Sequence, residues 1–244
     1  MRTAAALVIG NELLSGKIAD KNLVVLARTL RGLGVQLRRV VMTLDELDTI
    51  VAEVRALASS HDFLFTSGGV GPTHDDVTIE AVATAFGAPL VVSSAIEGLL
   101  RSYYGDRVTD GHLLMARIPE GARLVTSERV PWPTVVLRNV WMFPGVPEIF
   151  AMKMPLVEAE LAGDAPFHSL AVLTDLDEGQ LKALLDRVVA AHPTIEIGSY
   201  PRWSDPRIKT KLTFDGRDRA LALAARDAFA ASLPGHAIVE LVDD

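Results

Sequence analysis

The chain has 244 residues, of which 49% are hydrophobic, and it contains no cysteine. This composition is enough for one large domain or for a medium and a small one, and it excludes a globally disordered chain. The formal net charge of −7 argues against a general nucleic-acid-binding protein, and the absence of cysteine excludes disulfides, zinc–cysteine sites and a thiol nucleophile.

The first part of the chain alternates between apolar runs and segments with helical spacing. Residues 4–9 are continuously apolar, as expected for a strand buried on both faces. This run is too short to span a membrane and no cleavage-like region follows it, so we expect a cytoplasmic protein without a signal peptide or membrane contact. The pattern predicts further strands over 35–42 and 63–65, and helices over 22–33, around 50–57 and over 77–86.

Strands that alternate with helices of ten or more residues indicate βαβ units and an α/β domain with a mostly parallel sheet. The pattern is looser between residues 89 and 144. There we expect helices over 96–104 and 111–116, strands over 134–137 and 140–143, and then a helix over 148–161. Ligands of such sheets bind outside the carboxyl ends of the strands, where the loops at Gly10 and Gly68 fall.

A linker rich in Gly, Pro and small residues over 162–166 precedes a change in the order of elements. The pattern then predicts strands over 169–173, 194–199, 208–214 and 237–242, with helices over 178–191 and 217–233. This β-α-β-β-α-β order is that of a small α+β ferredoxin-like domain. We therefore expect two domains, residues 1–165 and 166–244. Within the second, Ile197–Pro201 is expected to form a turn between two strands.

The most informative motif is the segment Thr66–Thr78, which contains Gly68, Gly69 and Gly71 and follows an apolar run. A glycine-rich turn between a strand and a helix lets backbone N–H groups approach an anion, most often phosphate. Its spacing matches neither a Walker A loop nor the dinucleotide fingerprint. Asp75 and Asp76 would repel phosphate unless a metal ion lies between, or unless they act on a ribose, a water or a pterin-like ring. Alternatively, Asp76 caps the next helix.

Two further junctions carry polar residues that belong at the same edge of the sheet. The segment Gly10–Gly16 follows the first strand, and Asp20 and Asn22 precede the next helix, which either of them could cap. Asp45 follows the second strand, where it either caps a helix or reaches the pocket. His74 is expected to be solvated, and the other histidines have no metal-ligand spacing. Ser15 and Ser67 have no evident histidine partner, which argues against a serine-nucleophile hydrolase.

These segments, together with Phe143–Glu148 and Lys211–Phe214, resemble the molybdopterin-binding (MoaB/MogA-like) superfamily. Within it, the chain looks most like the N-terminal region of CinA and the molybdopterin-binding-like domain of FAD synthase. The resemblance implies a three-layer α/β core that holds a phosphate-bearing pterin or nucleotide, and a homo-oligomer, either a dimer or a trimer. No C-terminal amidohydrolase domain follows here, so nicotinamide-nucleotide deamidation is not expected.

The resemblance also implies functional roles for Asp76 and, less directly, Asp45. For CinA-like members it implies metal-dependent hydrolysis of a nucleotide pyrophosphate such as ADP-ribose or FAD. A divalent ion (Mg²⁺, Mn²⁺ or Co²⁺) held by Asp76, with Asp75 or Asp45, would neutralise phosphate charge and activate water. The residues expected to bind molybdopterin or an adenine nucleotide are Gly10, Asn11, Glu12, Ser15, Gly16, Asp20, Asn22, Ser67, Gly68, Gly69, Gly71, Pro72, Thr73, Pro144 and Gly145.

Two other functions remain open at this point. The chain could bind molybdopterin or transfer an adenylyl group in molybdenum cofactor synthesis, or it could be a nucleotide-binding module without catalysis. The small second domain favours the hydrolase, because plain MogA-like proteins resemble only the first domain.

Overall fold

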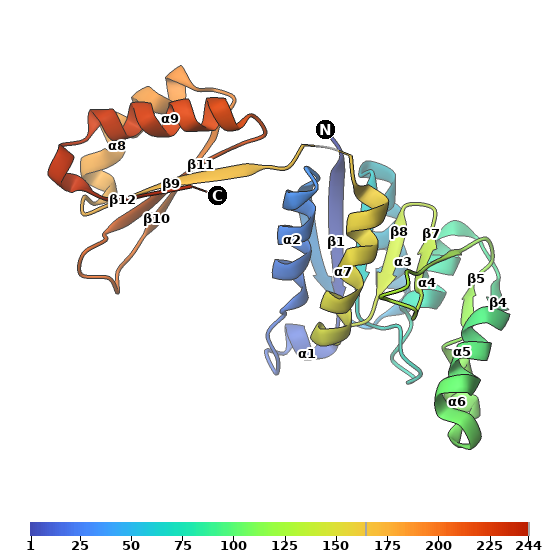
Figure 1. Cartoon of the computed structure of the whole chain (residues 1–244). Coiled ribbons are helices and arrows are strands. Elements are labelled where there is room, and N and C mark those ends of the chain that lie inside the picture. Colours follow the sequence, from blue (N-terminus) through green and yellow to red (C-terminus); the bar gives the residue numbers. More distant parts are fainter. Residues whose placement is uncertain (164, 244) are drawn as a thin grey trace. The chain divides into compact units, whose positions relative to one another are not determined.

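The computed structural model describes residues 1–163 and 165–243, and the chain divides into two units, Met1–Asp164 and Ala165–Asp244. Figure 1 shows a central sheet with helices in the first unit and a smaller sheet with two long helices in the second. The functional motifs of the sequence lie in the first unit.

The first unit is built on a six-stranded sheet with the strand order β2-β1-β3-β8-β7-β6. The first four strands run parallel, and β7 and β6 are antiparallel to their neighbours. The sheet strands are β1 (Thr3–Ile9), β2 (Gln36–Thr43), β3 (Phe63–Ser67), β6 (Arg123–Val125), β7 (Thr134–Leu137) and β8 (Val140–Phe143). The helices beside them are α1 (Asn11–Leu14), α2 (Asn22–Gly32), α3 (Leu47–Ser60), α4 (Thr78–Phe86) and α7 (Pro147–Leu161). The expected mostly parallel α/β fold is confirmed.

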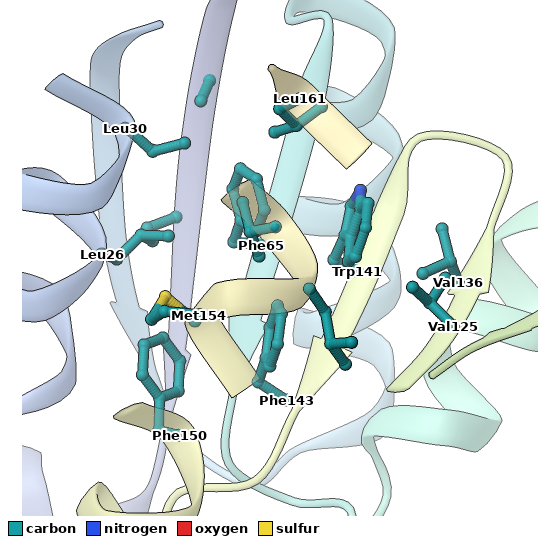
Figure 2. Packing of buried hydrophobic residues seen from close by; sticks show 14 of the residues in the cluster. Leu26, Leu30, Phe65, Val125, Val136, Trp141, Phe143, Phe150, Met154 and Leu161 are labelled. Carbon is teal, nitrogen blue, oxygen red and sulfur yellow. The ribbon is translucent and has the colours of Figure 1, made fainter. Parts of the chain in front are cut away.

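Helices cover both faces of this sheet, because successive strand residues point to opposite sides. Ala4 and Ala6 of β1 belong to the core under α2 and α7, whereas Ala5 and Leu7 belong to the core under α3 and α4. In Figure 2, Phe65, Trp141 and Phe143 pack beside side chains of α7 and α2. Small residues on β1 leave room for these rings. The first unit therefore has the three layers that the family resemblance implies.

An arm built from residues 90–119 extends away from the six-stranded sheet (Figure 1). It consists of β4 (Leu90–Val92), α5 (Ser94–Tyr104), the 3₁₀ turn Gly105–Arg107, α6 (Asp110–Leu114) and β5 (Arg117–Pro119), and β4 pairs with β5. Ser93 caps α5, and Thr109 forms a capping box with His112 at α6. The strands β4, β5 and β6 were not predicted, because three residues are too few to show an alternating pattern.

The second unit has the β-α-β-β-α-β order expected of a ferredoxin-like domain. Its antiparallel sheet has the strand order β10-β11-β9-β12, and residues of both long helices pack against it in one core. The elements are β9 (His168–Thr174), α8 (Glu178–Ala191), β10 (Glu196–Pro201), β11 (Thr210–Gly216), α9 (Arg219–Ser232), the 3₁₀ turn Gly235–Ala237 and β12 (Ile238–Val242). The expected turn at Ile197–Pro201 is wrong, because these residues belong to the strand β10 and pair with Thr210–Phe214 of β11.

Candidate functional site

The loops after β1, β2, β3 and β8 open into one cavity of about 940 Å³. Two glycine-rich segments reach it from different strands, and so do carboxylates from three loops. The residues that line it from the predicted set are Gly10, Glu12, Asp45, Gly68, Gly69, Gly71, Pro72, Thr73, Asp75, Asp76, Pro144 and Gly145. The parallel strands thus bring the Gly10 and Gly68 loops together, as the sheet topology predicts.

The glycine loop after β3 is shaped by backbone conformations that favour glycine. Gly68 and Gly69 have φ values of +105° and +67°. A Cβ atom on Gly68 would collide with the carbonyl oxygen of Ile9, and one on Gly69 would collide with the hydroxyl of Thr78. Thr78, the first residue of α4, donates from its hydroxyl to Gly68 O (2.8 Å) and from its N–H to Gly69 O (2.9 Å). The start of α4 is thereby fastened to the loop.

Three consecutive backbone N–H groups of the glycine loop are available to a ligand. Among the hydrogen bonds formed within residues 1–163, none uses the N–H of Gly69, Val70 or Gly71. All three residues line the cavity and are half-buried. Consecutive unpaired N–H groups beside a helix N-terminus form a cradle for an anion.

Asp75 and Asp76 are held by Thr73 and leave the helix start uncapped. The Thr73 N–H donates to Asp76 Oδ2 (2.8 Å), and the Thr73 hydroxyl lies 2.6 Å from Asp75 Oδ1 and 2.5 Å from Asp76 Oδ2. The hydrogen bond from the Thr73 side chain is the largest effect that lowers the pKa of Asp75. No side chain caps α4, so the alternative role of Asp76 as a helix cap is not found. Asp76 itself lines the cavity.

Asp45 connects the loop after β2 to the loop after β1. Its Oδ2 accepts a hydrogen bond from Asn11 N–H (2.8 Å), and it does not cap α3. Burial raises the pKa of Asp45, and the nearby charges of Glu12 and Asp75 raise it further against the lowering effect of the Asn11 bond. Glu12, Asp45 and Asp75 come from three different loops and all line this cavity.

The other predicted binding residues do not line the cavity. Asn22 on α2 is buried, and its Nδ2 donates to Ser67 Oγ (2.9 Å) and to Gly145 O (2.8 Å), which ties the loops after β3 and β8 together. Asp20 Oδ1 accepts a hydrogen bond from the Leu23 N–H (2.8 Å) in the first turn of α2. The Ser15 hydroxyl donates to Glu12 O (3.2 Å). The predicted residues outside the cavity lining are Asn11, Ser15, Gly16, Asp20, Asn22 and Ser67.

Comparison with known proteins assigns both units. Residues 5–161 match the family model described as a probable molybdopterin binding domain, and residues 166–242 match the middle domain of FAD synthase. The chain belongs to the molybdopterin-binding domain family. Among the residues that the structure describes, none of the helices could serve as a membrane span.

Similar proteins come from archaea and animals. A protein of Archaeoglobus fulgidus is 32% identical over 86% of this chain and 89% of its own length. A probable FAD synthase of Caenorhabditis briggsae is 32% identical over 97% of this chain, but the match spans only 50% of that protein. The crystal structure of the protein CinA from Thermoplasma acidophilum is 29% identical, with a TM-score of 0.60 over 66% of this chain and 98% of that one.

Among the described residues, the carboxylates that line the cavity do not form a complete metal site on their own. Within residues 1–163 and 165–243, no three His, Asp or Glu side chains gather closely enough to hold a metal ion. Asp75 and Asp76 share the Thr73 hydroxyl, and Asp45 reaches the same cavity from another loop. Such a donor set suits Mg²⁺, which is usually held by one or two carboxylates and completed by substrate phosphates.

The first unit also lines this cavity with aromatic and apolar residues that sequence reasoning missed. They come from the arm, from the segment before β7 and from α7, and include Tyr103, Tyr104, Leu114, Trp132, Ile149 and Met152. The buried cationic residue Lys153 also lines the cavity and was missed as well. They are separated by up to fifty positions and belong to the region of weak pattern. The adjacent pair Tyr103–Tyr104 and the Trp between two prolines were the available signals.

Proposed function

We propose that the chain binds a phosphate-bearing nucleotide in this cavity and hydrolyses a nucleotide pyrophosphate of the ADP-ribose or FAD class. The observation that carries the proposal is the row of unpaired N–H groups of Gly69, Val70 and Gly71, which lies in the same cavity as the Asp76 carboxylate. The N–H row supplies the site for a phosphate oxygen, next to the N-terminus of α4.

The carboxylates then need a positive charge between them and the phosphates. The donor set fits a divalent cation held by Asp76, with Asp75 or Asp45, and by the phosphates of the substrate. When bound, such an ion supplies charge neutralisation and a water of lowered pKa. The residues of the chain orient the substrate: the N–H row binds phosphate, Thr73 holds the two aspartates in place, and Asn22 keeps the loops after β3 and β8 together.

A second candidate function is molybdopterin binding or adenylyl transfer. It is favoured by the family description of residues 5–161 and by the match of residues 166–242 to the middle domain of FAD synthase. The cavity offers the same phosphate cradle to a pterin phosphate. A third candidate, a nucleotide-binding module without catalysis, uses the cradle alone.

The test is incubation with ADP-ribose, FAD or ATP in the presence of Mg²⁺, Mn²⁺ or Co²⁺, with chromatography of the products. We expect AMP release from ADP-ribose or FAD, and loss of activity with a chelator. Release of pyrophosphate during coupling of ATP to a second substrate would favour adenylyl transfer. Binding of these nucleotides without any turnover would favour the third candidate, a nucleotide-binding module without catalysis.

Asp76→Asn is the decisive variant of this assay. The amide oxygen can still accept the Thr73 N–H, so the loop keeps its shape, but the charge needed for a metal or a water is lost. We expect turnover to fall by about 100-fold or more. Asp218→Asn is the matched control, because Asn caps a helix nearly as well as Asp and Asp218, which caps α9, does not line the cavity. Equal activity of both variants would contradict the role of Asp76.

A further inference from the structure

The cavity contains a buried cation for which the proposed reaction has no use. The side chain of Lys153 on α7 is 3% exposed, and its Nζ donates to Trp132 O (3.0 Å), Pro133 O (2.8 Å) and Thr134 Oγ1 (3.2 Å). Burial lowers the pKa of Lys153 to about 8. Taking an ammonium group out of water is costly unless hydrogen bonds compensate. All three bonds go to one segment, residues 132–134, so Lys153 fixes that segment against α7.

The fixed segment presents Trp132 to the cavity. Trp132 lies between Pro131 and Pro133, whose rings restrict the backbone on either side. Its ring centroid lies 6.5 Å from that of Tyr103, with an interplanar angle of 71°. Both residues line the same cavity as the Gly69–Gly71 N–H row. We call Tyr103 and Trp132 the aromatic wall.

The other half of the aromatic wall is also held from behind. Tyr103 meets Tyr104 edge to face at 4.9 Å, and Tyr104 stacks on His112 at 3.8 Å. The Nδ1 atom of His112 accepts a hydrogen bond from the Thr109 N–H in the capping box of α6. Tyr103 is nevertheless 70% exposed. A large aromatic side chain that is supported on one side and open on the other is suited to contact a ligand.

We propose that the aromatic wall stacks the planar heterocyclic ring of the ligand whose phosphate occupies the Gly69–Gly71 N–H row, and that Lys153 is the residue that positions this wall. The inference rests on the proposed function. Because the two rings are strongly inclined, a flat ligand ring stacks on one of them and meets the edge of the other. The site therefore selects a phosphate that carries a flat ring, such as a nucleotide, over a bare phosphate or a sugar phosphate.

The test compares ligands with and without a ring on the full chain by titration calorimetry. The probes are AMP and FMN, which carry different rings, and ribose 5-phosphate and inorganic pyrophosphate, which carry none. We expect Trp132→Ala and Tyr103→Ala each to weaken AMP or FMN binding by about tenfold, the size of a lost base–aromatic stack, and to leave the ring-free ligands unchanged. Whichever of AMP and FMN loses more affinity in these variants carries the ring that the site prefers.

Matched variants guard against a change of fold. Trp132→Phe keeps a stacking surface and should restore most of the affinity. Trp203→Ala removes a tryptophan that is 96% exposed in the second unit and does not line this cavity, so it should change nothing. Lys153→Met should reproduce the selective loss of ring binding, and it should add nothing to Trp132→Ala if Lys153 acts through Trp132.

Two failures are distinguishable. If the wild-type chain binds neither AMP nor pyrophosphate, the proposed function fails and the aromatic wall fails with it. If the wild type binds both and the Trp132 and Tyr103 variants bind AMP and FMN equally well, only the aromatic wall is overturned. An equal loss for pyrophosphate and AMP would also overturn it, because the variants would then have damaged the phosphate cradle.

Discussion

Asp45 lines the cavity, and burial together with the charges of Glu12 and Asp75 raises its pKa, which has a consequence for stability. The folded chain binds the Asp45 proton more tightly than the unfolded chain. The stabilising contribution of that proton is complete below the ordinary value of 3.8 and is lost as the pH rises through the folded pKa. At neutral pH the ionised group therefore opposes folding.

We predict that Asp45→Asn increases the free energy of unfolding at neutral pH and that this gain shrinks as the pH falls towards about 3. The amide oxygen can still accept the Asn11 N–H. Asp62→Asn is the control with the opposite sign, because hydrogen bonds from the Thr3 N–H (2.7 Å) and hydroxyl (2.9 Å) lower the pKa of Asp62. Urea unfolding at several pH values measures both. The same sign for the two variants would contradict the electrostatic account.

Gly69 supplies a second prediction at this scale. We expect Gly69→Ala to lower the free energy of unfolding by more than the roughly 1–2 kcal/mol of a left-handed alanine, because its Cβ would also collide with the Thr78 hydroxyl. Gly87→Ala is matched, since Gly87 has the same φ of +67° and no atom within 4 Å of a built Cβ. Thermal unfolding compares them. Equal losses would show that the Thr78 contact relaxes without cost.

At the scale of elements, Lys153 joins α7 to the segment before β7. Replacing it with Met leaves the carbonyl groups of Trp132 and Pro133 without their donor, at a cost of about 1–3 kcal/mol for a buried group. We therefore predict a less stable Lys153→Met chain at neutral pH. Chemical denaturation of the variant and the wild type measures the difference, and a variant of wild-type stability would show that water satisfies these carbonyls.

The pH dependence gives this prediction a second check. The lowered pKa of about 8 means that the unfolded chain, whose lysines titrate near 10.5, binds the extra proton between these values. The contribution of Lys153 to the free energy of unfolding therefore rises with pH over that range. The wild type should gain stability relative to Lys153→Met on going from pH 8 to about 10.

How far an element was predictable depended on whether its signal was local. The buried strand β1 and the helices α2 and α8 follow directly from apolar runs and helical spacing. Gly198 and Pro201 misled the prediction, because both suggest a turn. A Cβ on Gly198 would instead press against the Tyr200 ring and the Thr213 hydroxyl, and Pro201 ends the edge strand β10, where a missing N–H is tolerated.

The same distinction separates the two halves of the site. The Gly68 loop and its aspartates could be predicted because a strand, three glycines and a helix are adjacent in sequence, and parallel strands bring the Gly10 loop to the same edge. Tyr103 lies in the arm, Trp132 in the segment before β7 and Lys153 on α7. Only the folded chain brings these three residues to one cavity. No spacing rule links those positions, so the apolar half of the cavity required the structure.

At the scale of the whole molecule, each unit has its own hydrophobic core. Residues of the first unit make up the clusters beneath α2 and α7, beneath α3 and α4, and beneath the arm, and the second unit is packed around Phe214 and Phe229. All residues that line the 940 Å³ cavity belong to the first unit. The second unit therefore need not supply residues to that cavity for it to exist.

We predict that a chain truncated after Gly163 folds cooperatively and binds AMP, because its cores and the N–H row of the Gly68 loop remain complete. Circular dichroism during thermal unfolding checks the fold, and calorimetry compares the affinity for AMP with that of the full chain. A truncated chain that unfolds cooperatively but does not bind AMP would show that the second unit contributes binding residues.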